Sequence, residues 1–216
     1  MKYIYVLFIA CMLISCEKDQ IGRYDLGTYV YFTLTETEEQ AFSFFYYPGV
    51  ESKELEYEVK LMGDLLSEDK TFELYVDEEK TTATPDMYEL DLHPVFHKGV
   101  ATDKVSVLLK NTNRLLEGKE VTLVFGIKEN ENFQPGFVGQ RSITINFDDK
   151  ANQPPWWNST VVLYLGEYTP EKLTEFIKCT GVNDLTDVDE TLIRKYALDF
   201  KKYNEEHGLG FDIPAY

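Results

Sequence analysis

Residues 54–61, Glu54-Leu55-Glu56-Tyr57-Glu58-Val59-Lys60-Leu61, alternate charged and apolar side chains without a break. Successive side chains of a β-strand point to opposite faces, so this period of two predicts a strand with one face in a core and one in water. Similar strand-length segments lie on both sides of it. They are residues 28–34, 41–47, 72–76, 105–109, 121–127 and 143–147, of which the first two are aromatic and β-branched runs.

Seven such segments within about 120 residues are typical of an antiparallel β-sandwich. Turn-forming pairs such as Pro48-Gly49 and Gly63-Asp64 separate them, and no segment of helical period interrupts them, which argues against a βαβ fold. We therefore expect a mainly β fold, an Ig-like antiparallel sandwich spanning residues 28–150.

The pattern changes in residues 151–216, which begin with a proline-containing connector and the pair Trp156-Trp157. Thr169-Pro170 resembles a helix N-cap followed by proline at the first helical position, and Gly181 would end that helix. Asp187 followed by Glu190 resembles a capping box, and Gly208 is a natural C-cap for the second helix.

This small α-helical C-terminal unit offers little core of its own, so we expect it to dock on the sandwich. Its apolar side chains at helical spacing should pack together and against the sandwich: Leu173, Phe176, Ile177, Leu192, Tyr196 and Phe200.

The N-terminal residues predict an export signal. Lys2 precedes an apolar run, and the small residue Ser15 stands directly before Cys16. Leu13-Ile14-Ser15-Cys16 resembles the bacterial lipobox, which implies removal of residues 1–15, a diacylglycerol thioether on Cys16 and acylation of the new amino terminus. Residues 16–27 would then be the lipidated cysteine and a flexible tether, and the membrane would be a partner through this lipid.

The tether begins Cys16-Glu17-Lys18-Asp19, without an Asp directly after the cysteine. This resembles the surface-export tag of Bacteroidota lipoproteins, which implies an outer-membrane anchor facing the cell exterior. The alternative is a solvated tether with no sorting role, which leaves the periplasmic face open. A formal net charge of −17 disfavours nucleic acid as a partner, because phosphate backbones are repelled.

The chemistry-bearing residues predict neither catalysis nor a metal or other cofactor. Cys179 is the one cysteine left beyond Cys16, and we interpret it as a buried, inert side chain, with a catalytic thiol as the alternative. His93 and His97 have zinc-helix spacing, but Pro94 disfavours a helix there. The sequence contains neither the Gly-x-Ser-x-Gly motif of a serine nucleophile nor a glycine-rich phosphate-binding loop. A glycosidase needs only two carboxylates, so it remains an alternative.

Trp156 and Trp157 are the candidate ligand-binding residues, because indole faces stack on the apolar faces of sugars. The alternative is a wedge between the sandwich and the helical unit, since the pair lies at their junction.

Three motifs resemble the Bacteroidota lipoprotein family called domain of unknown function 4843. They are Thr28-Tyr29-Val30-Tyr31-Phe32, Ala83-Thr84-Pro85-Asp86-Met87-Tyr88-Glu89, and Pro155-Trp156-Trp157 leading to Leu165-Gly166-Glu167-Tyr168. The middle motif also resembles a Calx-beta domain, some members of which bind calcium through paired Asp residues. Asn111-Thr112-Asn113 stands at that place here, so the resemblance does not extend to a calcium site.

The resemblance implies a nutrient or glycan context. We expect a non-catalytic surface lipoprotein that serves as an accessory binding or docking module of an outer-membrane uptake system. Its partners would be the transporter or neighbouring surface lipoproteins, with a glycan as a further candidate. The alternatives are a structural subunit of an adhesin-like surface assembly and, third, a small glycan-active enzyme.

Overall fold

Strand β3 (Ser52–Met62) contains the alternating octapeptide and is the centre of one sheet. It pairs antiparallel with β8 (Thr102–Lys110), with Tyr57 opposite Val105. Tyr57 and Val59 are buried, while Glu54, Glu56 and Glu58 are exposed, as the period of two predicts. The computed structural model describes residues 27–214.

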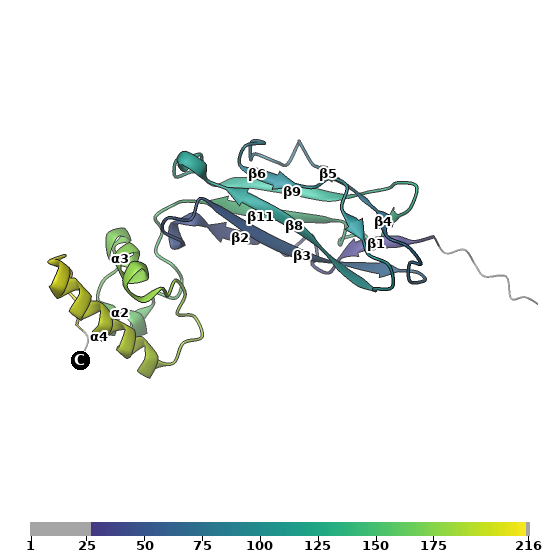
Figure 1. Cartoon of the computed structure of the whole chain (residues 1–216). Helices are drawn as coiled ribbons and strands as arrows, with labels where there is room; N and C mark the ends of the chain where they lie inside the picture. Colours follow the sequence, from purple (N-terminus) through teal and green to yellow (C-terminus); the bar gives the residue numbers. More distant parts are fainter. Residues whose placement is uncertain (1–26, 215–216) are drawn as a thin grey trace, which may run out of the picture.

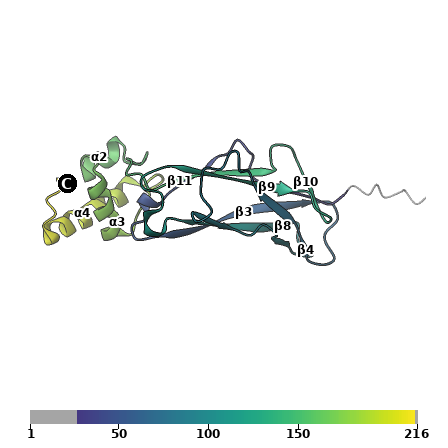
Figure 2. The same cartoon turned by 90° about the horizontal axis from the view of Figure 1, so that it is seen from above.

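Two sheets face each other in an elongated sandwich, and the helices lie beyond one end of it (Figures 1 and 2). One sheet has the order β10-β1-β3-β8-β6 and the other β2-β11-β9-β5, while β4 and β7 pair separately. The remaining strand bounds are β1 Tyr29–Phe32, β2 Gln40–Ser43, β4 Lys70–Thr71, β5 Glu73–Val76, β6 Tyr88–Leu90, β7 Val95–Phe96, β9 Val121–Lys128, β10 Gln134–Pro135 and β11 Ser142–Asp148. The predicted mainly β sandwich followed by helices is confirmed.

The sandwich is mixed rather than purely antiparallel. β1 joins one sheet and β2 joins the other, so the chain crosses between the sheets after Phe32. β2 then runs parallel to β11, and β1 runs parallel to the short β10. The predicted strand over residues 41–47 ends at Ser43, because Phe44–Tyr46 form a 3₁₀ turn, η2.

Aromatic and branched side chains fill the space between the sheets. Phe32 and Phe125 meet edge to face with ring centroids 5.7 Å apart, and both are fully buried. Buried side chains from β1, β3, β8, β9 and β11 form one continuous cluster with them. This cluster makes the sandwich a hydrophobic unit in its own right.

Three helices follow the connector: α2 (Ser159–Leu165), α3 (Pro170–Thr180) and α4 (Glu190–His207). The caps at Thr169, Gly181 and Gly208 are confirmed; the Thr169 hydroxyl accepts a hydrogen bond from the Lys172 amide at 3.1 Å. The predicted cap at Asp187 is wrong, because α4 begins two residues later and the carboxylate of Asp189 accepts from the Leu192 amide. None of the helices between residues 27 and 214 is long and apolar enough to span a bilayer.

The helical unit has a hydrophobic cluster of its own, which corrects the expectation that its apolar face would pack on the sandwich. Leu173, Phe176, Ile177 and Phe200 are buried in it, and Tyr196 packs against it. Leu192 is only half-buried and lies outside the cluster. On the sandwich side of the junction, Phe45 and Tyr46 pack against this cluster. The connection therefore runs through η2 rather than across a sheet face.

Candidate functional site

Cys16 and the signal peptide, the predicted lipid anchor, lie outside the described residues 27–214.

Trp156 and Trp157 belong to the core of the helical unit. Trp156 is 7% exposed and Trp157 is 1% exposed, and both rings lie within 6.5 Å of the Phe176 ring. The Trp157 Nε1 group donates to the Gly166 carbonyl at 3.1 Å. Neither indole face is open for a sugar to stack on, which corrects the prediction of a ligand-binding pair. The alternative, a wedge between the sandwich and the helical unit, is wrong about where the rings lie, because their ring partners belong to the helical unit.

Lys172 contacts the Leu165-Gly166-Glu167 motif that follows the tryptophans. Its ammonium group is buried and donates to the carbonyls of Leu165 at 3.1 Å, Glu167 at 2.7 Å and Asp212 at 3.0 Å. Burial lowers the pKa of Lys172, against the opposing effect of nearby Asp212 and Glu167. Lys172 thus joins the end of α2 to the C-terminal segment, which is a structural role.

Cys179 and His97, considered above as a candidate nucleophile and a candidate zinc ligand, also have local roles. Burial raises the pKa of the Cys179 thiol, which disfavours the thiolate that a nucleophile needs. His97 Nδ1 lies 2.7 Å from Asp103 Oδ2, and this hydrogen bond raises the pKa of His97. Within residues 27–214, no group of three or more His, Cys, Asp or Glu side chains is placed to hold a metal ion.

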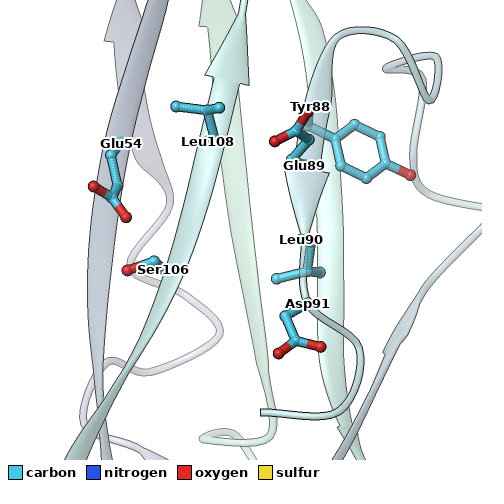
Figure 3. A pocket seen from close by; sticks show the side chains of 7 residues that line it. All are labelled: Glu54, Tyr88, Glu89, Leu90, Asp91, Ser106 and Leu108. Atoms are coloured by element: carbon cyan, nitrogen blue, oxygen red, sulfur yellow. The ribbon is translucent and has the colours of Figure 1, made fainter.

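An acidic hollow of about 620 Å³ lies on the outer face of the β3-β8-β6 sheet (Figure 3). Strand pairing places Glu54, Leu108 and Glu89 in one row across the three strands. The Tyr88 ring points away from Glu54 and Ser106, and Lys110 already pairs with Glu89. The acidic hollow therefore offers carboxylates but no aromatic face beside them.

A second hollow, of about 300 Å³, combines aromatic and polar side chains around η2, and we call it the η2 hollow. It is formed where β2 runs beside β11, a pairing that places Ala41 opposite Asn146 and Ser43 opposite Asp148. The lining residues come from β2, η2, β11 and the chain next to them: Ala41, Phe42, Ser43, Tyr46, Tyr47, Glu120, Asn146, Asp148 and Asn152.

The aromatic wall of the η2 hollow is held in place by ring contacts and one hydrogen bond. Phe42 and Tyr47 stack with centroids 5.0 Å apart and an interplanar angle of 24°. The Tyr46 hydroxyl donates to the Asn152 carbonyl at 3.2 Å. Burial, with a smaller contribution from the Asp148 charge, raises the pKa of Tyr46, so this hydroxyl remains a donor at neutral pH.

The Ser43 hydroxyl is the least satisfied polar group of the η2 hollow. Its oxygen is buried and has no hydrogen-bond partner among the described residues. The neighbouring Asn146 amide, by contrast, accepts from the Thr122 hydroxyl at 2.7 Å and donates to Glu39 at 3.0 Å. A buried hydroxyl without a partner costs free energy. Its oxygen has almost no accessible surface, so a ligand hydroxyl would supply the missing bond once the Ser43 side chain rotates toward the hollow that it lines.

Sequence reasoning missed this site, although a signal is present. Residues 42–47, Phe-Ser-Phe-Phe-Tyr-Tyr, contain five aromatic side chains in six positions. A half-buried strand buries only every second side chain, so such a run must place aromatic rings outside the sandwich core.

Solved structures similar to this chain include CBD12 from CALX1.2, with 13% identity, a TM-score of 0.38 and 56% of this chain covered. A candidate carbohydrate-binding protein from Bacteroides ovatus has 13% identity and a TM-score of 0.40 over 56% of the chain. A two-domain protein of unknown function from Bacteroides fragilis has 14% identity and a TM-score of 0.40 over 63%. The matched parts make up 44%, 37% and 51% of those chains, and similarities this low transfer no ligand or reaction.

No curated protein matches the chain. The family described as domain of unknown function (DUF4843) matches residues 24–182. The match includes the whole sandwich, the connector, α2 and α3, and it ends before α4. Because it spans well over half of the sequence, the chain belongs to the DUF4843 family.

Proposed function

We propose that this protein is a non-catalytic surface lipoprotein that binds a glycan in the η2 hollow and serves an outer-membrane uptake system. The observation that carries the proposal is the meeting of the Phe42–Tyr47 stack with the unpartnered Ser43 hydroxyl in one hollow. A sugar ring needs both features, an aromatic face for its C–H groups and polar partners for its hydroxyls.

The size of the η2 hollow fits a short segment of a glycan chain better than a whole oligosaccharide. Its volume of about 300 Å³ lies at the lower end of ligand pockets. Its two acids are engaged with one lysine residue: Glu120 lies 3.4 Å from Lys150 Nζ, and Asp148 accepts from the Lys150 amide. These contacts favour holding a glycan over hydrolysing it.

A lipid on Cys16 would place the η2 hollow at the end of the sandwich that points away from the membrane. β1 begins at the end of the sandwich opposite the helices, whereas β2 and η2 lie toward the helices (Figure 1). The eleven residues 17–27 reach roughly 36–40 Å when extended. The anchored sandwich would then stand clear of the headgroups, with the η2 hollow at its far end.

Calorimetry of the whole chain in detergent with a panel of neutral oligosaccharides tests the proposal. Tyr47→Ala should weaken binding by about tenfold or more, since a stacking face is lost. Ser43→Ala should also weaken binding without loss of stability, because it removes an unpartnered hydroxyl. Tyr75→Ala is the matched control, because Tyr75 is an exposed aromatic residue of the same sheet that lies outside the hollow.

Binding that survives Tyr47→Ala and Ser43→Ala would exclude the η2 hollow as the site. Hydrolysis of a bound oligosaccharide would exclude a non-catalytic role. For the anchor, Cys16→Ala should accumulate as an unprocessed precursor, and normal cleavage of this variant would refute the lipoprotein assignment.

A further inference from the structure

A third hollow, of about 510 Å³, lies between the sandwich and the helical unit, and we call it the junction hollow. Tyr47 lines both this hollow and the η2 hollow. Thr174 of α3 lines its helical side, and Glu51 and Arg114 line its sandwich side. The two hollows are therefore neighbours that share one aromatic side chain.

Arg114 is the distinctive group of the junction hollow. None of the ion pairs of the described residues involves its guanidinium group, although Glu51 and Asp149 line the same hollow. Asp149 is already engaged, since its two carboxylate oxygens accept from Asn111 Nδ2 at 3.2 Å and from the Gly118 amide at 2.6 Å. At least nine lysines of the described residues pair with a carboxylate, whereas this guanidinium remains available.

The backbone that carries Arg114 is strained and firmly held. Asn113, Arg114 and Glu117 have φ values of 55°, 60° and 48°, in the left-handed region that side chains other than glycine disfavour. The Asn111 side chain fixes the loop by accepting from the Leu116 amide at 3.0 Å. Strain of this kind persists where surrounding contacts impose it, and here it sets the position of an arginine at a hollow.

We infer that the junction hollow binds the carboxylate of an acidic sugar, with the Arg114 guanidinium group as its anchor. The inference rests on the proposed function and narrows its ligand class to glycans that contain uronic acid. Uronic acids are anions too, so contact with Arg114 has to outweigh the long-range repulsion by the net charge of −17, which salt screens. Guanidinium and carboxylate match as two parallel hydrogen bonds, which a neutral sugar cannot offer. The Lys53 ammonium, 5.6 Å from the centroid of the Tyr47 ring, adds positive charge beside the aromatic wall that the two hollows share.

The charge of the ligand can be tested with matched probes. We would measure binding of the whole chain to trisaccharides of galacturonic, glucuronic and guluronic acid, each against its methyl ester, which keeps the rings and removes the charge. At least one acid should bind about tenfold to a hundredfold more tightly than its ester, the range expected for hydrogen bonds to a charged group. This preference should shrink at high salt, because the site is open to solvent.

Three variants separate the role of Arg114 from effects on folding. Arg114→Gly should remove the preference for the acid while the melting temperature stays unchanged or rises, because glycine adopts a φ of 60° without strain. Arg114→Lys should keep part of the preference, since the charge remains and the paired geometry is lost. Lys119→Gln is the control: it removes the same charge from the same loop, where Lys119 pairs with Glu117, and should keep the preference.

Equal affinity of the wild type for every acid and its ester would overturn the inference, as would a preference that survives in Arg114→Gly. Either result leaves glycan binding in the η2 hollow standing if neutral oligosaccharides bind there. Binding of no glycan of either kind would overturn the proposed function and the inference with it.

Discussion

Replacing Lys172 by Met tests the contact that holds the helical unit together. Met keeps an unbranched side chain of similar length, so little cavity is created, but three carbonyls lose their donor. The Leu165 carbonyl is buried, and the carbonyls of Glu167 and Asp212 are partly buried. Leaving one buried and two partly buried carbonyls without a donor destabilises the fold, while removing a buried ammonium group offsets part of that cost. We expect the free energy of unfolding to fall by about 2–4 kcal/mol.

Urea unfolding followed by tryptophan fluorescence measures this loss directly. The protein has two tryptophans, Trp156 and Trp157, and both lie in the core of the helical unit, so their emission reports that unit. Lys178→Met is the matched control, because Lys178 lies on the same helix and makes an exposed ion pair with Glu175. The control should lose less than about 0.5 kcal/mol.

The pH dependence of Lys172→Met provides a second, independent check. Burial lowers the pKa of Lys172 below its usual 10.5, so the folded protein releases this proton before the unfolded chain does. Between the lowered pKa and 10.5 the unfolded chain binds more protons, and wild-type stability rises with pH relative to the variant. The gap between the two proteins should therefore widen toward pH 10.5. A loss below about 1 kcal/mol at neutral pH, or a gap that narrows with pH, would refute the role given to Lys172.

Three further predictions concern other parts of the fold. Trp157→Ala should cost about 3–5 kcal/mol by urea unfolding, because the ring is 1% exposed; an unchanged midpoint would contradict its burial. Gly166→Ala should destabilise more than Gly49→Ala, since both have positive φ but only at Gly166 would a Cβ lie 2.7 Å from a main-chain carbonyl; equal losses would show that strain alone matters. The His97–Asp103 pair should stabilise the protein fully below pH 6.5 and lose this contribution as pH rises through the raised pKa of His97; a His97→Gln variant with the same pH profile as the wild type would disprove it.

The sequence predicted those elements whose signal lies within a few residues. β3, β8 and β9 follow the period of two because each has one face in the core. The caps at Thr169 and Gly208 are equally local, since a single side chain or a single φ angle ends the helix. β4, β6, β7 and β10 were missed because two or three residues are too few to show a period.

Long-range pairing explains what the sequence could not show. The η2 hollow exists because β2 runs parallel to β11, a contact between residues about a hundred positions apart that depends on where the chain crosses between sheets. The tryptophan pair was predicted to bind a ligand, with packing at the junction as the alternative, and both rings lie buried in the helical unit. Its place was misjudged because a connector beside two prolines indicates a junction, whereas the turn at Gly166 folds α2 and α3 back around the rings.

The aromatic segment 42–47 connects these observations. Phe44 is buried in the sandwich cluster and Phe42 packs against it, whereas Phe45 and Tyr46 pack against the helical cluster. Tyr47 completes the segment by lining both the η2 hollow and the junction hollow. Consecutive residues of one short segment thus contribute to two cores and two hollows, which no single period can encode. A ligand that orders this segment would therefore act on the junction between the units as well as on its own site.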